Sequence, residues 1–122
     1  MNRILVVDDE PNLRLVYREV LGEEGYEVLE AESVKETFDI LNREPVDLVV
    51  LDIKLRSESG LDVLQRITKE FPTIPVVLCS AYVSFQNDYT SWLADSYIVK
   101  SSDPQELLKE IRRVLSKRGK TK

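Results

Sequence analysis

Five short apolar runs alternate with longer amphipathic segments along the chain. The runs are rich in Val, Ile and Leu, and four of the five show little alternation between apolar and polar positions. Strands of a parallel sheet that is covered on both faces have this pattern, whereas a strand with one face in water alternates. The predicted strands cover residues 4–7, 26–29, 48–51, 76–79 and 97–99, and the second, which alternates most, is expected at an edge.

The segments between these runs have the apolar spacing of amphipathic helices. In the first of them, apolar side chains recur three and four residues apart from residue 13 to residue 21. Ser33 and Glu36 form a capping box for the second helix. Asp103 caps the last helix and places Pro104 at its first position. Helices are therefore predicted at residues 13–21, 33–41, 61–71, 84–94 and 103–118.

This alternation of strands and helices indicates the fold class. It predicts an α/β fold in which a doubly wound, five-stranded parallel sheet is flanked by five helices with right-handed crossovers. A chain of 122 residues forms one domain and buries enough surface to fold without disulfides. The domain is expected to cover residues 1–118, and the basic residues 119–122 to form a disordered tail or the start of a linker.

Composition and charge exclude several functions. The chain has 17 Lys and Arg against 22 Asp and Glu, and its formal charge of −5 argues against direct nucleic-acid binding by this domain. The absence of His excludes triads, metal sites and phosphocarriers that need an imidazole from this chain. Cys79 is the single Cys, so a disulfide within the chain is excluded and a reducing, cytoplasmic location is expected. No apolar run is long enough to span a membrane.

Polar side chains follow four of the five predicted strands. They are Asp8, Asp9 and Glu10 after the first, Asp52 after the third, Ser80 after the fourth and Lys100 after the fifth. Because parallel strands end at one edge of the sheet, where such folds bind ligands, we expect these side chains to converge. Crowded aspartates attract a cation, and their hard oxygen atoms suit Mg²⁺. An ammonium and a hydroxyl suit phosphoryl oxygens, so the set predicts an aspartyl-phosphate site with Asp52 as the nucleophile.

The stretches around these residues are more specific than the residues alone. They are ILVVDDE at 4–10, LVVLD at 48–52, SGL at 59–61, PVVLCSA at 75–81 and YIVK at 97–100. Together they resemble, over essentially the whole chain, the receiver domain of two-component response regulators. The resemblance implies a flavodoxin-like sheet with strand order 2-1-3-4-5. It also implies a phosphoacceptor that assists its own phosphorylation and dephosphorylation and is not a turnover enzyme.

The resemblance implies the phosphoryl donor and the metal ligands. Asp52 accepts the phosphoryl group from the phospho-histidine of a sensor histidine kinase or a phosphotransfer protein. Asp9, Asp52 and the backbone carbonyl of Lys54 bind Mg²⁺, for which Mn²⁺ can substitute, and Asp8 contributes directly or through water. The missing imidazole of this chain is then supplied by the donor protein.

The resemblance also implies a set of phosphoryl contacts and a switch. Ser80, Ala81 and Lys100 contact the phosphoryl group. Tyr97 turns inward when Ser80 moves toward the phosphate, and this changes the surface of the fourth helix, fifth strand and fifth helix. That surface is expected to control an output protein or a tethered effector domain, and a phosphorylation-dependent dimer is compatible with it.

Some positions depart from the family pattern. The family usually has Pro where this chain has Arg56 and Ser101, and the segment between the fourth and fifth strands is shorter than usual. The fourth helix is therefore expected to be shortened or irregular. Lys54 and Tyr82 are expected to flank the phosphoryl group, and we hypothesise that their long side chains restrict the attacking water and slow dephosphorylation.

Three other functions share parts of this pattern. A degenerate receiver would act as a phosphorylation-independent interaction module, but the complete set of acidic, hydroxyl and ammonium groups argues against it. An aspartate-nucleophile phosphatase typically has a second carboxylate two residues after the nucleophile, where this chain has Lys54. Flavin binding needs a phosphate loop rich in glycine and hydroxyl groups after the first strand, where this chain is acidic. The phosphoacceptor is therefore favoured, and the degenerate receiver is the alternative.

Overall fold

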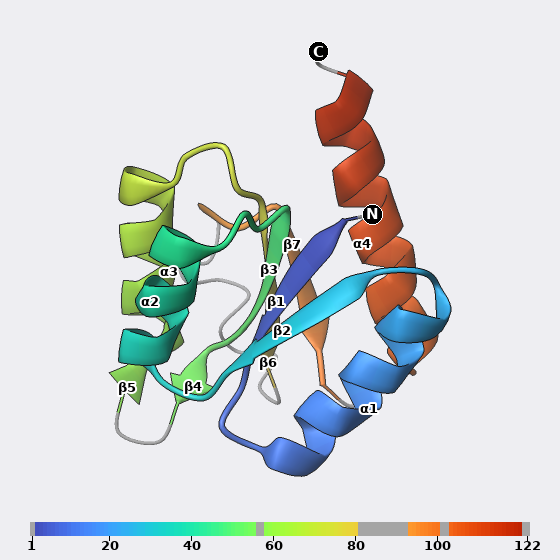
Figure 1. Cartoon of the computed structure of the whole chain (residues 1–122), viewed down its shortest axis with the longest axis horizontal. Coiled ribbons are helices and arrows are strands. Elements are labelled where there is room, and N and C mark those ends of the chain that lie inside the picture. The colour runs from blue at the N-terminus through green and yellow to red at the C-terminus, as the bar shows by residue number, and fades with distance from the viewer. Residues whose placement is uncertain (1, 56–57, 81–92, 101–102, 121–122) are drawn as a thin grey trace.

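The computed structural model describes residues 2–55, 58–80, 93–100 and 103–120. Its centre is a five-stranded parallel sheet between two layers of helices (Figure 1). The strands are β1 (Arg3–Val7), β2 (Glu27–Ala31), β3 (Leu48–Asp52), β6 (Val76–Ser80) and β7 (Ser96–Val99). Their order is β2-β1-β3-β6-β7, which confirms the predicted order 2-1-3-4-5 and the edge position of the second strand.

The described residues form four helices, which cover both faces of the sheet. They are α1 (Pro11–Glu23), α2 (Val34–Arg43), α3 (Gly60–Glu70) and α4 (Pro104–Lys120). α2 and α3 lie on one face, and α1 and α4 lie on the other (Figure 1). The fourth predicted helix, at 84–94, falls almost entirely outside the described residues. α4 extends to Lys120, and the domain boundary at residue 118 stays a prediction.

The strands contribute side chains to two hydrophobic cores, one on each face of the sheet, which explains their nearly continuous apolar sequences. Leu5 and Val7 of β1 pack in the cluster under α2 and α3, whereas Ile4 and Val6 pack in the cluster under α1 and α4. All four side chains are at most 1% exposed. A strand that buries both faces cannot place polar residues at alternate positions, so the predicted origin of the pattern is confirmed.

The predicted caps of α2 and α4 are also confirmed. The Ser33 hydroxyl oxygen accepts a hydrogen bond from the Glu36 N–H (3.2 Å) at the start of α2. Before α4, Asp103 Oδ1 accepts a hydrogen bond from the Gln105 N–H (2.9 Å). These bonds satisfy N–H groups that have no partner within the first turn of a helix.

A short hairpin between β3 and α3 was not predicted. It consists of β4 (Lys54–Leu55) and β5 (Glu58–Ser59), which pair antiparallel with Lys54 opposite Ser59. Two-residue strands are too short to produce a periodic pattern in the sequence. The hairpin is relevant to the site because its pairing determines the path of the backbone directly after Asp52.

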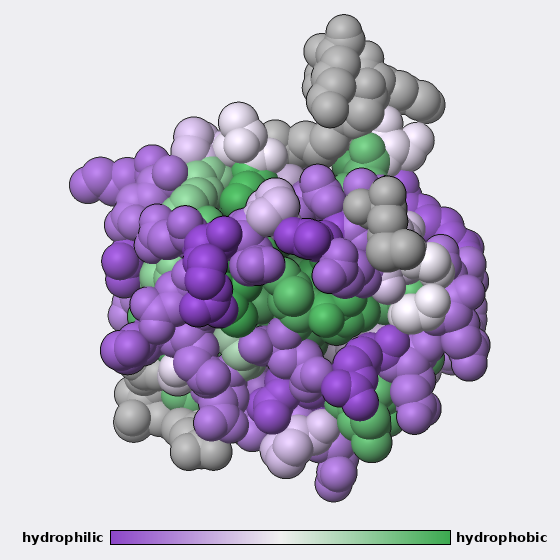
Figure 2. All heavy atoms as spheres, in the orientation of Figure 1, coloured by the Kyte–Doolittle hydropathy of each residue, from purple (hydrophilic) through white to green (hydrophobic). Residues whose placement is uncertain are grey.

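The surface is mainly hydrophilic on the face where β2 lies in front (Figure 2). Apolar atoms show between the hydrophilic residues over β1 and β2, and Val28 and Leu29 of this edge strand are half-buried. Among the described residues, no helix combines the length and the apolar content needed to cross a membrane.

Candidate functional site

The acidic loop after β1 forms one side of the site. Asp8 is 2% exposed; its N–H donates to the Ala31 carbonyl of β2 (3.1 Å), and its Oδ1 accepts from the Glu10 N–H (2.9 Å). Carboxylate oxygens of Asp8, Asp9 and Glu10 lie within 4.8 Å of one another. The loop therefore gathers three carboxylates at the end of one strand.

Asp52 and Lys100 complete the described part of the site from the ends of β3 and β7. Asp52 is 4% exposed, and Lys100 Nζ lies 2.9 Å from its Oδ2. The same Nζ lies 3.0 Å from Asp8 Oδ2 and 4.0 Å from Glu10 Oε1. The carboxylates of Asp8 and Asp52, which lie 44 positions apart in the sequence, thus converge on one ammonium, as the strand-end argument predicts.

Lys100 is held in its charged form. Its burial lowers the pKa, but the hydrogen bonds to Asp52 and Asp8 and the charges of both carboxylates raise the pKa by more. The net direction is upward from the ordinary value of 10.5. The site therefore contains a permanent positive charge at neutral pH, suitable for an anionic group.

The donor set fits a divalent cation. Asp8, Asp9 and Glu10 supply hard carboxylate oxygens within 4.8 Å of one another, and the buried carboxylate of Asp52 shares Lys100 with Asp8. One ammonium offsets only one of these four formal charges. Crowded carboxylates with excess negative charge favour binding of a cation, and Mg²⁺ typically binds through one or two carboxylates.

Gly60 packs against the backbone of the site, a contact that the sequence pattern does not predict. Its N–H donates to the Ile53 carbonyl, and a Cβ at this position would lie 1.9 Å from the carbonyl oxygen of Asp52. The first residue of α3 thus packs directly on the backbone of Asp52. Its position in the matched stretch SGL was the available signal, but steric contact with Asp52 cannot be derived from spacing.

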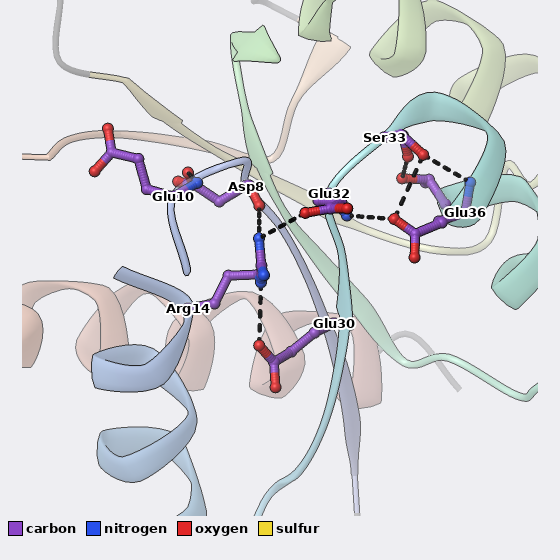
Figure 3. A network of polar contacts seen from close by, with 8 residues as sticks. Asp8, Glu10, Arg14, Glu30, Glu32, Ser33 and Glu36 are labelled. Atoms are coloured by element: carbon purple, nitrogen blue, oxygen red, sulfur yellow. Dashed lines mark hydrogen bonds and ion pairs between the residues drawn. The ribbon is translucent and has the colours of Figure 1, made fainter. Parts of the chain in front are cut away.

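Arg14 is the second residue that the sequence analysis missed. Its guanidinium reaches from α1 to the main-chain carbonyl of Asp8 and to the carboxylate of Glu30 in β2 (Figure 3). The side chain is 15% exposed, which is low for an arginine near the surface. A basic residue beside the apolar stripe of the first helix was the only sequence signal.

A buried polar contact lies among the apolar residues between α1 and the sheet. The Tyr17 hydroxyl and the Cys79 thiol are 3.3 Å apart, and the two residues are 5% and 1% exposed. Burial raises the pKa of Tyr17 above its ordinary value, and burial raises the pKa of the Cys79 thiol to about 11. Both groups therefore remain neutral at physiological pH.

We expect Cys79 to be unreactive in the folded protein. Thiolate is the form that attacks, and a buried thiol with a pKa of about 11 offers little thiolate near pH 8. An aromatic disulfide reagent should label the urea-unfolded chain quickly and the folded chain only at the rate of unfolding. Absorbance of the released thiolate measures both rates, with Cys79→Ala as the background. Equal labelling rates for the folded and unfolded chains would contradict the expectation.

Several predicted site residues lie wholly or partly outside the described residues. Backbone atoms of Ser80 and Lys54 are placed, in β6 and β4, and Ser80 pairs with Val99 of β7. The groups that remain outside are the side chains of Ser80 and Lys54, and Arg56, Ala81, Tyr82 and Ser101. Tyr97 is half-buried against the core under α2 and α3. The roles of these residues stay predictions.

A family model and several known proteins match this chain. Residues 4–112 match the family model "Response regulator receiver domain". The chain is 36% identical over 115 residues to the probable transcriptional regulator ycf27 of Porphyridium aerugineum, which covers 93% of this chain. It spans 48% of the length of that relative. It also spans 18% of the response regulator PilR of Pseudomonas aeruginosa, to which it is 40% identical over 82 residues.

Solved structures show the same fold. One is the response regulator TrrA of Thermotoga maritima in complex with Mg²⁺ and BeF, which is 42% identical to this chain with a TM-score of 0.88. The match covers 93% of this chain and 98% of TrrA. The structure of TrrA in complex with the histidine kinase ThkA matches at 43% identity with a TM-score of 0.87. That match covers 94% of this chain and 99% of the matched chain. These matches cover nearly the whole chain, and their TM-scores agree with the fold described above. The chain therefore belongs to the receiver domains of two-component response regulators.

Proposed function

We propose that this receiver accepts a phosphoryl group on Asp52 from the phospho-histidine of a sensor histidine kinase or a phosphotransfer protein. The observation that carries the proposal is the convergence of the buried carboxylates of Asp52 and Asp8 on Lys100, at 2.9 and 3.0 Å. The relative TrrA has been solved with Mg²⁺ and BeF and with the histidine kinase ThkA, which supports a metal and a kinase partner.

The transfer needs one nucleophile and groups that stabilise negative charge. A carboxylate oxygen of Asp52 forms the new bond to phosphorus while the N–P bond of the donor breaks, and the donor imidazole keeps the electron pair. Lys100 contacts Asp52 in the described structure and would interact with the oxygens of the arriving phosphoryl group. We assign the remaining contacts to the Ser80 hydroxyl and Ala81.

The acidic residues would hold the metal. We assign Mg²⁺ to Asp8, Asp9, Asp52 and the backbone carbonyl of Lys54, and Mn²⁺ can substitute for it. When bound, the ion offsets the charge of the carboxylates and of the phosphoryl oxygens. This leaves Asp52 able to approach an anionic donor that its own charge would repel.

The output would pass through β7 and α4. The Ser96 hydroxyl of β7 donates to Glu110 Oε1 of α4 (2.6 Å), so the strand that carries Tyr97 and precedes Lys100 is tied to that helix. We assign Ser80 and Tyr97 the switch that changes this surface after phosphorylation. The partner would be an output protein or a tethered effector domain, since the longer relatives include a probable transcriptional regulator.

A small phosphodonor tests the proposal. Incubation with acetyl phosphate and Mg²⁺ should add the mass of one phosphoryl group to the wild type and none to Asp52→Asn, because the neutral amide has no anionic carboxylate oxygen to act as the nucleophile. Asp39→Asn is the control, since Asp39 pairs with Lys35 on the exposed face of α2. Intact mass spectrometry measures the gain, and circular dichroism verifies folding. A wild type that gains no mass would favour the phosphorylation-independent interaction module.

A further inference from the structure

We infer that Arg14 is a positioning residue for the acidic site, holding the main chain of Asp8 so that its carboxylate and that of Asp9 are oriented for a cation. The inference rests on the proposed metal site. Arg14 itself would contact neither the metal nor the phosphoryl group. It acts through the peptide bond that joins the two aspartates.

The contacts of Arg14 link three parts of the fold (Figure 3). Its Nη1 donates to the carbonyl oxygen of Asp8, and its Nε donates to Glu30 Oε1 of β2 at 3.1 Å. Nη1 also lies 3.9 Å from Glu32 Oε2, in the loop after β2. One guanidinium thus ties α1 to the ends of β1 and β2.

These contacts hold the main chain of Asp8 and Asp9 without involving their carboxylates. The carbonyl that accepts from Arg14 belongs to the peptide between Asp8 and Asp9, so its orientation determines the directions of both residues. The Asp8 N–H is already bound to Ala31, and Asp8 Oδ2 is bound to Lys100. Arg14 therefore holds the one remaining polar atom of the Asp8 backbone. Groups behind a metal ligand commonly change metal affinity in this way, although they do not touch the metal.

The charge of Arg14 and its positioning contact predict opposite effects of its removal on Mg²⁺ binding, which makes the inference testable. A positive charge near the site should by itself repel Mg²⁺, so removing Arg14 would tighten binding. Glu30 and Glu32 lie beside the guanidinium and offset its charge. Loss of the bond to the Asp8 carbonyl should therefore dominate and weaken binding.

Arg18 provides a matched control on the same helix. It lies one turn further along α1, and its Nη1 is 3.2 Å from Oε2 of the same Glu30. Its side chain is 56% exposed, and its described ion pair is with Glu30 and not with the Asp8 loop. Replacing Arg18 removes the same charge from the same helix and an ion pair with the same glutamate.

The experiment measures Mg²⁺ binding to the full chain by calorimetry. We expect Arg14→Met to raise the Kd for Mg²⁺ by about tenfold. Arg14→Lys should also raise the Kd, because an ammonium cannot reproduce the fork of the guanidinium. Arg18→Met should stay within about twofold of the wild type. Amide exchange at Asp9 and Glu10, measured by NMR without metal, should be faster in both Arg14 variants only.

Two results would overturn the inference. One is an Mg²⁺ Kd for Arg14→Lys and Arg14→Met that equals or is lower than the wild-type value. The other is an equal rise of the Kd in Arg14→Met and Arg18→Met, which would indicate a general effect of charge or stability. Failure of the proposed function looks different, because then the wild type itself would neither bind Mg²⁺ nor gain a phosphoryl group.

Discussion

Gly60→Ala is expected to destabilise the protein by about 3 kcal/mol or more. The new Cβ would lie 1.9 Å from the carbonyl oxygen of Asp52 and 2.7 Å from the Cα of Ile53. Both are backbone atoms of the segment that leaves β3, so no side-chain rotation relieves the contact. The end of β3 or the start of α3 must shift, and a shift of β3 displaces Asp52 from Lys100. Urea unfolding followed by circular dichroism measures the loss.

Gly22→Ala is the matched control for this substitution. Gly22 lies inside α1, and among the described residues no atom beyond its chain neighbours and the adjacent helix backbone lies within 4 Å of a Cβ added there. Alanine has the higher helix propensity, so this variant should gain about 0.5–1 kcal/mol. A Gly60→Ala protein as stable as the wild type would show that the backbone around Asp52 yields more easily than the structure indicates.

Lys100→Met is expected to cost about 3 kcal/mol of stability in the absence of metal. The substitution leaves the buried carboxylates of Asp8 and Asp52 without the ammonium that lies between them. Their repulsion and desolvation are then uncompensated, which is the reason that loss of one member of a buried ion pair is costly. Adding Mg²⁺ should recover more stability in the variant than in the wild type, because the ion replaces the missing cation. Urea unfolding with and without Mg²⁺ measures both effects.

The stability difference between the wild type and Lys100→Met depends on pH in a way that follows from the direction of the Lys100 pKa shift. The pKa of Lys100 in the folded protein lies above its ordinary value of 10.5, so folding favours the protonated form. Its stabilising contribution is complete below the ordinary pKa and is lost only as the pH rises through the raised value. The stability difference between the wild type and Lys100→Met should therefore be constant from about pH 6 to pH 9.

Lys35→Met serves as the control for Lys100→Met. Lys35 pairs with Asp39 at 3.1 Å, but its side chain is 87% exposed. Water and salt screen this pair, so its removal should change the free energy of unfolding by less than about 0.5 kcal/mol. An equal loss of unfolding free energy in Lys100→Met and Lys35→Met would show that burial does not strengthen the Lys100 contacts.

Much of the fold was predictable because apolar patterning is a local property of the chain. Runs such as residues 48–51 carry no polar alternation, which is typical of a strand buried on both faces. Asp8, Asp52 and Lys100 could be placed together for a related reason. Parallel strands end at one edge, so residues that follow different strands meet there whatever their separation in the sequence.

Other features depended on tertiary contacts. The sequence alone determined the two-sided parallel sheet, the caps at Ser33 and Asp103, and the edge where the charged groups of the site meet. The tertiary structure decided which backbone atoms Gly60 and Arg14 touch. Spacing along the chain specifies which edge of the sheet a residue occupies, but close approach depends on how a helix is seated against the strands. That seating is determined by the packing of whole side-chain layers and not by any single stretch of sequence.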